Sequence, residues 1–513
     1  MRTKHSFYNF VVSLITSVIL PLVGFVKISL FVKLYGSDIN GLQLTIAQII
    51  MFLNICELAF SLAFRQLLFK PLANNDQETV LKIYHGAKKI FKLTGTVVLI
   101  LGCLIAIVFP FFAQSPLDYF QTVMTFIILC VPYGISYYMM GPNFVIIADQ
   151  QEYKINIWIQ TFAILRMVLM IGVILAKMSF FWIIVIEGAN ILISNFVARR
   201  IALKAYPWLK NKPMDCTDKS FEKNAKYTII QRLSILATSN TDNIVITMFM
   251  GYNMTSIFGV YSYLTDSVSK IINSAITSPI NSFGNLFNDD RADAYNVFTE
   301  FFNFAIYIAS IISICIFVVM NEFLVYWMKD PEQYSVTILV AFLFAINIFY
   351  LTMREPIIIS RDANGLFKDA KNNAYLMAVS KVILSVVLIQ FWGIAGVLAA
   401  TLLTNWVVDF LYNPVLVYKK VFKLNPIRYY AMVASRLLLA MGVGLISYII
   451  WNNNLAYIEG GMIHFIIACL ILGMSVGGVM TLIYAVSYKS YRNLFIRLLS
   501  IFKRSRINPE TLK

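Results

Sequence analysis

The chain has 513 residues, of which 59% are hydrophobic and 13% are charged, and its mean hydropathy is +0.73. This composition excludes an ordinary soluble domain and is typical of a membrane protein built from many apolar segments of about 20 residues. The net charge of +16 does not indicate nucleic-acid binding. The Lys and Arg residues stand in short loops between apolar runs, where they indicate topology and contact with the anionic headgroups of membrane lipids.

In chain order, the apolar runs predict an all-α polytopic membrane protein with about 14 transmembrane helices. The first run continues from Arg2 and Lys4 to about Tyr35 without a cleavage site of small residues, so we interpret it as a retained span rather than a signal peptide. The spans centre on residues 10–34, 39–63, 91–112, 119–148, 155–177, 179–203, 227–250, 256–287, 299–321, 334–358, 372–391, 393–418, 429–451 and 461–487.

The loops alternate between a basic set and a set that is almost free of positive charge. The second set contains only Lys33, Lys177 and Lys329. Basic residues are retained on the cytoplasmic side of bacterial membranes. The pattern therefore predicts that both termini are cytoplasmic, in a protein of the bacterial plasma membrane.

A weak internal repeat relates the two halves of the chain. The first and seventh spans each end in a short turn between two glycines, at Gly36 and at Gly251. The fourth and tenth spans carry the proline-interrupted segments 142–149 and 356–362, each ending near an Asp. Repeated halves with broken helices are how many transporters are built. Because the matching spans are six apart, the predicted repeat is parallel; chance similarity between apolar sequences is the alternative.

The stretch Tyr227–Phe287 is apolar enough for a membrane but too polar to face lipid. Polar residues of its second span recur at helical spacing and form one stripe, made of Ser262, Asp266, Lys270, Asn273, Thr277 and Asn281. Charged groups at membrane depth are costly, so the stripe is expected to face protein or water. We interpret it as the wall of a transport cavity, and a helix–helix contact made by Ser, Thr and Asn is the alternative.

No enzyme signature is present. The sequence contains no phosphate-binding glycine loop, no HExxH and no Cys–His pair at the spacing of metal ligands, and its six cysteines include no CxxC pair. We therefore expect no enzyme activity, no cofactor and no metal, and we expect transport to draw on an ion gradient, the membrane potential or substrate mass action.

The number of spans, the Tyr-Gly-x-x-x-x-Gly-Leu turn that includes Ser37–Leu42, the segment Ala363–Lys368 and the polar seventh and eighth spans together resemble a Wzx-like polysaccharide flippase. That family belongs to the multidrug/oligosaccharidyl-lipid/polysaccharide (MOP) exporter superfamily. The resemblance implies two six-helix bundles arranged in a V, at 1–204 and 227–418. It also implies a basic cytoplasmic linker at 205–226, two further helices at 419–487 and a basic tail at 488–513.

The resemblance also implies the substrate, an undecaprenyl-diphosphate-linked oligosaccharide that is moved to the outer leaflet for capsule, exopolysaccharide or related glycan synthesis. Whether the polysaccharide polymerase machinery is a further partner stays open. A diphosphate needs cationic groups at membrane depth, and sugars need polar partners. The expected cavity ligands are Lys27, Lys270, Arg166, Lys381 and Asn273, and the expected ion-coupling or gating residues are Glu57, Asp242 and Asp266.

Two of these assignments have alternatives in the sequence itself. Arg166 and Glu187 flank one external turn and are expected to pair if they have no role in binding. Lys27 and Asp242 occupy matching positions, nine residues before Gly36 and Gly251, and three outcomes are open for them: a gate, a permanent structural bond, or no contact. Two other functions remain open at this point: a cation-coupled multidrug exporter of the same superfamily, and a membrane glycan polymerase, against which the absence of a long external loop counts.

Overall fold

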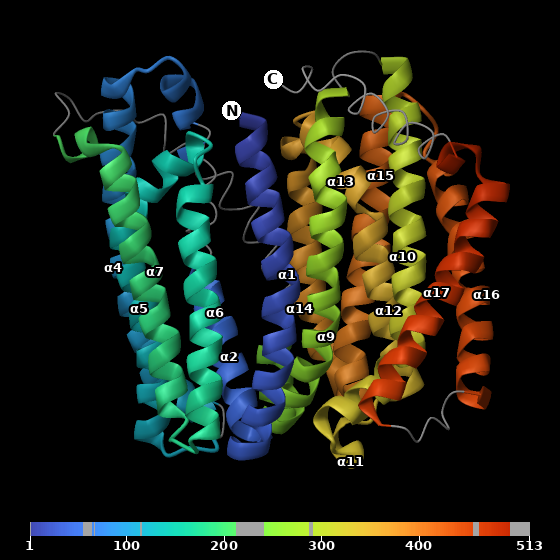
Figure 1. Cartoon of the computed structure of the whole chain (residues 1–513), viewed down its shortest axis with the longest axis horizontal. Helices are drawn as coiled ribbons and strands as arrows, with labels where there is room; N and C mark the ends of the chain where they lie inside the picture. Colours follow the sequence, from blue (N-terminus) through green and yellow to red (C-terminus); the bar gives the residue numbers. More distant parts are fainter. Residues whose placement is uncertain are drawn as a thin grey trace. The chain divides into compact units, whose positions relative to one another are not determined.

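The computed structural model describes residues 2–54, 64–65, 67–112, 115–211, 241–286, 291–454 and 461–492, with 2–17 and 272–286 described through the backbone (Figure 1). The described residues form helices and contain no strand. Eleven of their helices are long and apolar enough to cross a membrane. One of these, Asp369–Phe422, covers two predicted spans because the chain reverses at Gly393. The prediction of an all-α polytopic membrane protein is confirmed.

The chain divides into two compact units, Met1–Val260 and Tyr261–Lys513. The first contains α1 (Arg2–Tyr35), α2 (Ser37–Leu53), α4 (Gln77–Phe112), α5 (Tyr119–Ala148), α6 (Tyr153–Leu175), α7 (Phe181–Ala205), the 3₁₀ turn η1 (Pro207–Lys210) and the first part of α9 (Asp242–Leu286). The second contains the rest of α9, α10 (Arg291–Met328), α11 (Pro331–Tyr334), α12 (Ile338–Met353), α13 (Glu355–Ala363), α14 (Phe367–Leu403), α15 (Phe410–Val417), α16 (Ile427–Asn454) and α17 (Met462–Ser487). The predicted boundaries of the six-helix bundles stay predictions.

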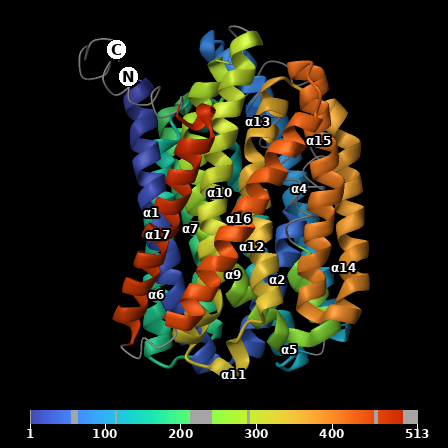
Figure 2. The same ribbon diagram turned by 90° about the vertical axis from the view of Figure 1, so that its right-hand side faces the viewer.

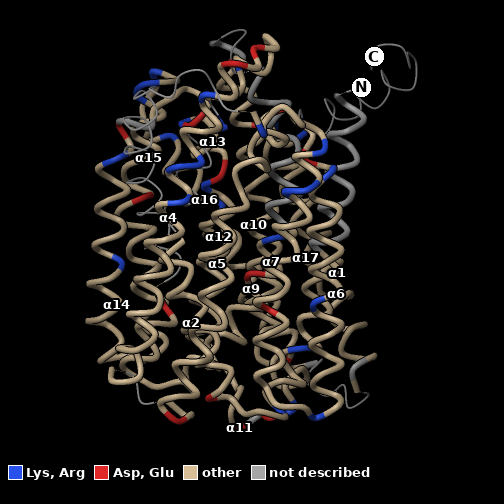
Figure 3. The backbone as a smooth tube through the Cα atoms, turned by 90° about the vertical axis from the view of Figure 1, so that its left-hand side faces the viewer, with Lys and Arg blue, Asp and Glu red and all other residues tan. Residues whose placement is uncertain are grey.

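Charged residues are sparse along the helices and are more frequent near their ends (Figure 3). In unit 1, basic residues accumulate where α4 and α6 begin and where α7 ends; the exposed ones are Lys88, Lys89, Arg200, Lys204 and Lys210. Successive antiparallel helices bring these helix ends to the same side. The predicted orientation of the chain in the membrane rests on this uneven distribution of basic residues.

The predicted repeat is visible in the backbone. Residues with positive φ, which L-amino acids rarely adopt, recur at a spacing of 215 or 216 positions. The pairs are Gly36 (φ 90°) with Gly251 (φ 84°), Gln150 (φ 60°) with Gly365 (φ 66°), and Lys177 (φ 52°) with Gly393 (φ 56°). Three matched turns in the same order support a parallel duplication, and the six-span spacing predicted from the glycine and proline segments agrees with it.

In unit 1, the chain after Gly251 packs against α2. The carbonyl oxygen of Tyr252 approaches Gly41 so closely that a Cβ at this glycine would lie 1.9 Å from it. Buried hydroxyls continue this contact: Thr45 of α2 bonds to Thr247, before Gly251, at 2.6 Å, and Thr247 bonds to Thr255, after Gly251, at 2.7 Å. This polar seam requires a glycine at position 41, because any side chain would force the helices apart.

A second cluster in unit 1 lies where the basic helix ends gather. Phe64, Leu68, Tyr84 and Phe144 pack with Leu209 of η1 into one buried apolar core. α4 has 36 residues and is therefore about 54 Å long, which exceeds the roughly 30 Å of a hydrocarbon core. Its first turns thus extend into a folded cap beyond the membrane.

The cap is closed by Tyr206, whose hydroxyl donates to the carboxylate of Asp149. Burial, together with that carboxylate, raises the pKa of the Tyr206 hydroxyl. The tyrosine therefore remains a hydrogen-bond donor at ordinary pH. The contact fixes the chain that leaves α7 against the turn between α5 and α6.

In unit 2, α16 and α17 lie beside α10 (Figure 2). Arg436 of α16 is 5% exposed and donates through Nε and Nη2 to Oδ1 of Asn303 in α10, at 2.9 and 2.6 Å. Asn303 in turn donates to Ser490 at 2.7 Å, and the guanidinium lies 4.2 Å from the ring centroid of Tyr488. The two additional helices are thus fixed to the bundle by a buried polar network as well as by apolar packing.

Candidate functional site

Unit 1 brings three of its ionisable side chains together at membrane depth. Arg166 of α6 forms an ion pair with Glu187 of α7. Lys27 of α1 interacts electrostatically with both of them, and its Nζ lies 4.8 Å from the ring centroid of Phe31. We call Lys27, Arg166 and Glu187 the unit 1 triad. With all three groups ionised, the unit 1 triad carries one excess positive charge.

The expected pairing of Arg166 with Glu187 is present, and it does not remove Arg166 from the candidate site. The side chains of Arg166 and Glu187 are 21% and 22% exposed, so both are partly accessible. Nε of Arg166 is buried and has no hydrogen-bond partner. A partly accessible guanidinium can form paired hydrogen bonds with a phosphate group.

The counterpart of Arg166 in unit 2 is Lys381, 215 positions later, as the sequence predicts. Each reaches the next helix past the turn: Arg166 contacts Glu187, and Lys381 hydrogen-bonds to Thr401. Lys381, unlike Arg166, is fully buried, and its neighbour Ser385 is buried too. The repeat therefore preserves the contact but not its accessibility, which makes Lys381 a poorer candidate for substrate binding than Arg166.

The remaining predicted site residues either belong to α9 or lie outside the residues that the structure describes. Asp266 and Lys270 are exposed, whereas Val260 and Tyr261 are buried, so these two members of the polar stripe lie on the exposed side of their helix. Asp242, the first residue of α9, is partly buried. Glu57 lies outside the described residues, as does the side chain of Asn273. The structure does not test the roles assigned to these residues.

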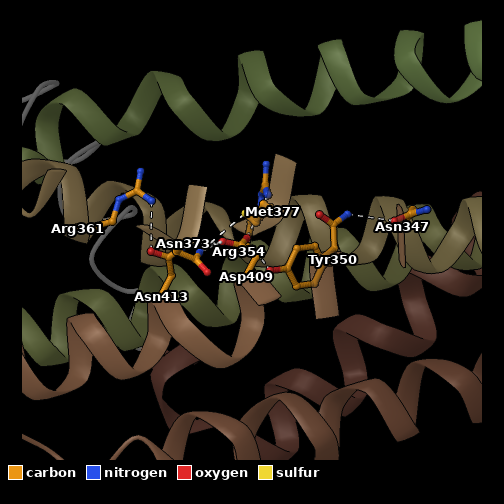
Figure 4. Close-up of polar contacts among 9 residues, drawn as sticks. Asn347, Tyr350, Arg354, Arg361, Asn373, Met377, Asp409 and Asn413 are labelled. Atoms are coloured by element: carbon orange, nitrogen blue, oxygen red, sulfur yellow. Dashed lines mark hydrogen bonds and ion pairs between the residues drawn. The ribbon is translucent and has the colours of Figure 1, made fainter. Parts of the chain in front are cut away.

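A second polar centre lies within unit 2 (Figure 4). It joins α12 and α13 to the span that follows Gly393. Its central group is Asp409, which is 3% exposed. One carboxylate oxygen, Oδ2, accepts hydrogen bonds from the hydroxyl of Tyr350 at 2.7 Å and from Nη1 of Arg354 at 3.2 Å. The other, Oδ1, accepts from Asn373 at 3.5 Å and from Asn413.

The same two helical segments are joined on either side of Asp409. Asn405 donates to Asn347 at 3.3 Å, and Arg361 donates to Asn413 at 3.3 Å. Arg361 is also paired with Asp362 at 2.8 Å. Polar groups therefore run along both facing helices, rather than along one helix facing water.

The backbone is irregular at both members of the central ion pair. Asp409 ends a π-helical segment, Thr404–Asp409, which precedes α15. Arg354 stands at the break between α12 and α13, just before Glu355 and Pro356. π-helical turns are rare and are frequent at functional sites. Asp409 lies 16 residues beyond Gly393 and Arg354 lies 16 beyond Ile338, so each is about 24 Å from the start of its span.

The sequence points to part of this centre. Asp409 is one of the acidic residues within the predicted spans, but Arg354 and Arg361 belong to the basic loop set that supports the predicted orientation. The structure instead places Arg354 in an ion pair with Asp409. The sequence signal that identifies the centre is a run of polar residues four positions apart, Asn405, Asp409 and Asn413. The stripe in the eighth span shows the same helical periodicity.

No family model matches the chain, and no curated protein matches it. Solved structures do. The lipid II flippase MurJ in an inward closed conformation aligns with a TM-score of 0.66 at 14% identity, over 93% of this chain and 99% of that one. An inward-facing multidrug resistance MATE transporter of the MOP superfamily aligns with a TM-score of 0.54 at 14% identity, over 80% and 98%.

The eukaryotic MATE transporter AtDTX14 aligns with a TM-score of 0.55 at 10% identity, over 82% of this chain and 97% of that one. The chain has the fold of the MOP-superfamily transporters. At these identities the likeness establishes the fold, and the substrate has to be argued from the residues.

Proposed function

We propose that this protein is a flippase that moves an undecaprenyl-diphosphate-linked oligosaccharide from the cytoplasmic to the outer leaflet of a bacterial plasma membrane. The observation that carries the proposal is the extent of the fold match. The lipid flippase aligns with 93% of the chain, whereas the first MATE transporter aligns with 80%. The difference is comparable in length to α16 and α17, which the Arg436 network binds into unit 2.

The chemistry of the unit 1 triad supports an anionic substrate. Lys27 and Arg166 share one carboxylate, that of Glu187, and the surplus charge is positive. A cation exporter of the same fold needs an acidic cavity, because it must attract its substrate. A diphosphate needs the opposite, fixed cations that replace the water it loses on entering the membrane.

Lys270 and Asp266 of unit 2 are further residues to which we assign a role in transport. They lie one helical turn apart on the exposed side of α9. We assign Lys270 to the diphosphate and Asn273 to the sugar. Asp242, Asp266 and Glu57 are assigned to gating or ion coupling. Both termini are assigned to the cytoplasm, on the alternation of basic loops with loops almost free of positive charge along the sequence.

The test is a strain that lacks this protein. Lipid-linked oligosaccharides are expected to accumulate in the cytoplasmic leaflet and the surface glycan to disappear. Reintroducing the protein should remove the accumulated lipid-linked oligosaccharide and restore the surface glycan. The Lys27→Gln variant, expressed at the same level, should do neither. A deletion strain with normal surface glycan and raised sensitivity to cationic drugs would refute the flippase and favour the exporter.

A further inference from the structure

The ion pair of the unit 1 triad uses only part of the Arg166 guanidinium. A guanidinium carries several N–H donors and commonly holds a carboxylate through a pair of them. Here Nη1 of Arg166 donates to Oε1 of Glu187. Within the part of the chain that the structure describes, the buried Nε of Arg166 has no hydrogen-bond partner. Arg166 therefore has donor capacity left for a second acceptor.

Both partners of this ion pair can be reached by an incoming group. The side chains of Arg166 and Glu187 are about one-fifth exposed, whereas Lys381, the counterpart of Arg166 in unit 2, is fully buried. A partly exposed ion pair is held weakly, because water stabilises the two charges when they separate. A phosphate group offers a guanidinium the same paired hydrogen bonds as a carboxylate. It can therefore take the place of Glu187 on Arg166.

One carboxylate serves both cations of the triad. Lys27 interacts electrostatically with Glu187, which attracts it, and with Arg166, which repels it. In a diphosphate that links a lipid to a sugar, each phosphate carries a negative charge, so the diphosphate can neutralise both cations. Glu187 is then the surplus charge of the occupied site, and it repels the bound diphosphate.

The contact between these two helices does not require a carboxylate. In unit 2 the matching contact is made by a neutral group, because Lys381 hydrogen-bonds to the hydroxyl of Thr401. Leu402 stands 215 positions after Glu187, at the place that the repeat assigns to it. Charged side chains at membrane depth are costly and are usually functional. The carboxylate of Glu187 therefore indicates a role other than packing.

A cation is a poor ligand for Glu187. Its charged neighbours in the triad are two fixed cations, Lys27 and Arg166, and both would repel a sodium ion bound to the carboxylate. Displacement of Arg166 by sodium would also leave the guanidinium without its counter-ion at membrane depth. An anion, by contrast, is attracted by both cations.

We propose that Glu187 is a counter-ion that the substrate displaces. Its carboxylate holds Arg166 while the site is empty, yields the guanidinium to a phosphate group of the lipid-linked diphosphate, and takes it back when that lipid leaves. The exchange replaces one ion pair by another and changes no covalent bond. Because the carboxylate competes with the phosphate, it lowers the affinity of the site and favours release of the substrate. This role rests on the proposed function, since it concerns the same site.

The test is a calorimetric titration of the purified full-length protein, in phosphatidylcholine nanodiscs, with inorganic pyrophosphate as the probe. Glu187→Gln should lower the Kd of pyrophosphate about tenfold or more, because the competing charge is gone. Glu187→Leu, which introduces the residue type of unit 2, should lower it too. Arg166→Gln and Lys27→Gln should each raise it. Glu78→Gln is the matched control: it removes the same charge from the ion pair with Lys82 in the same unit and should leave the Kd unchanged.

A double-mutant cycle separates displacement from plain repulsion. If Glu187 competes for Arg166, Glu187→Gln should gain much less affinity in the Arg166→Gln background than in the wild type. Equal gains in both backgrounds, or unchanged or weaker binding in Glu187→Gln, would overturn the proposal. Absence of pyrophosphate binding in both the wild type and Glu187→Gln would do the same.

The deletion strain separates this role from the proposed function. Tighter binding in Glu187→Gln together with normal surface glycan in the deletion strain would refute the flippase function alone. The reverse pair of results, unchanged binding in Glu187→Gln and loss of surface glycan in the deletion strain, would refute the counter-ion role alone.

Discussion

The two halves of this molecule share their turns and differ in their charges. Positive-φ residues recur at matching positions in both, and Arg166 and Lys381 make matching contacts. Yet the net positive triad of unit 1 lies about 13 to 18 Å along its helices from the turns at Gly36 and Met178, whereas the ion pair of unit 2 lies about 24 Å from the starts of its own spans at Ile338 and Gly393. The repeat thus specifies where the backbone bends, and each half has its own electrostatic function.

The largest expected effect comes from giving unit 2 the uncharged residues that unit 1 has 215 positions earlier, Met139 for Arg354 and Ser194 for Asp409. Arg354→Met alone leaves Asp409 buried without its cation, and we expect a loss of about 3–5 kcal/mol of stability. Arg354→Met combined with Asp409→Ser should recover most of it, because neither charge remains. Thermal unfolding in detergent measures both variants. A double variant as unstable as the single one would mean that unit 2 needs the ion pair for folding.

The second-largest effect is expected where α2, which follows Gly36, packs against the chain that follows Gly251. Gly41→Val places a side chain against the Tyr252 carbonyl, and overpacking of this kind costs about 1–3 kcal/mol or more. Gly172→Ala is the matched control in the same unit, since nothing lies within 4 Å of its Cβ, and it should be neutral or slightly stabilising. Equal melting temperatures for the two variants would contradict the close contact.

Substitutions of three lysines, Lys27, Lys270 and Lys381, should separate effects on transport from effects on stability. Lys27→Gln and Lys270→Gln should abolish export at normal protein levels, because they remove accessible cations. Lys381→Gln should lower the melting temperature instead, because Lys381 is fully buried. Surface glycan and protein level, measured in the same cells, test the distinction. Export at the wild-type rate from Lys27→Gln would remove the unit 1 triad from the site.

The smallest expected effect concerns the proposed gate between Lys27 and Asp242. Lys27→Asp and Asp242→Lys should each impair export, and the double swap should recover part of it if the two groups pair during transport. The structure shows Glu187 and Arg166 as charged neighbours of Lys27, so we expect the recovery to be partial at best. Equal loss in single and double variants would leave Lys27 as a plain substrate ligand.

The fold was predictable from sequence because each span carries its own signal. Apolar runs mark the helices, and Gly36 and Gly251 mark the turns, since both adopt a backbone that glycine favours. Their spacing also predicts the repeat. Arg166 with Glu187 was predictable as a pair because the two residues flank a single turn and lie at similar depth.

The unit 2 centre was only partly predictable. Asp409 and Arg354 are 55 positions apart, and their contact depends on a π-helical segment that shifts the register of the side chains. A regular helical periodicity does not contain that shift. Arg354 also precedes Glu355 and Pro356 in a basic region, so its charge alone indicates a loop. The polar stripe of the eighth span, by contrast, could be predicted from periodicity alone, and its role stays a prediction.

The Arg436 network has a consequence for how the chain is made. Asn303 and Arg436 are 133 positions apart, and ribosomes add about 5–20 residues per second. Some 7 to 27 seconds therefore pass between the synthesis of α10 and that of its guanidinium partner. During that interval the amide of Asn303 lies in a half-built bundle without the group it is shaped to receive. Newly made protein thus passes through a stage in which α10 lacks this polar partner, and a stop codon placed before α16 would make that stage permanent.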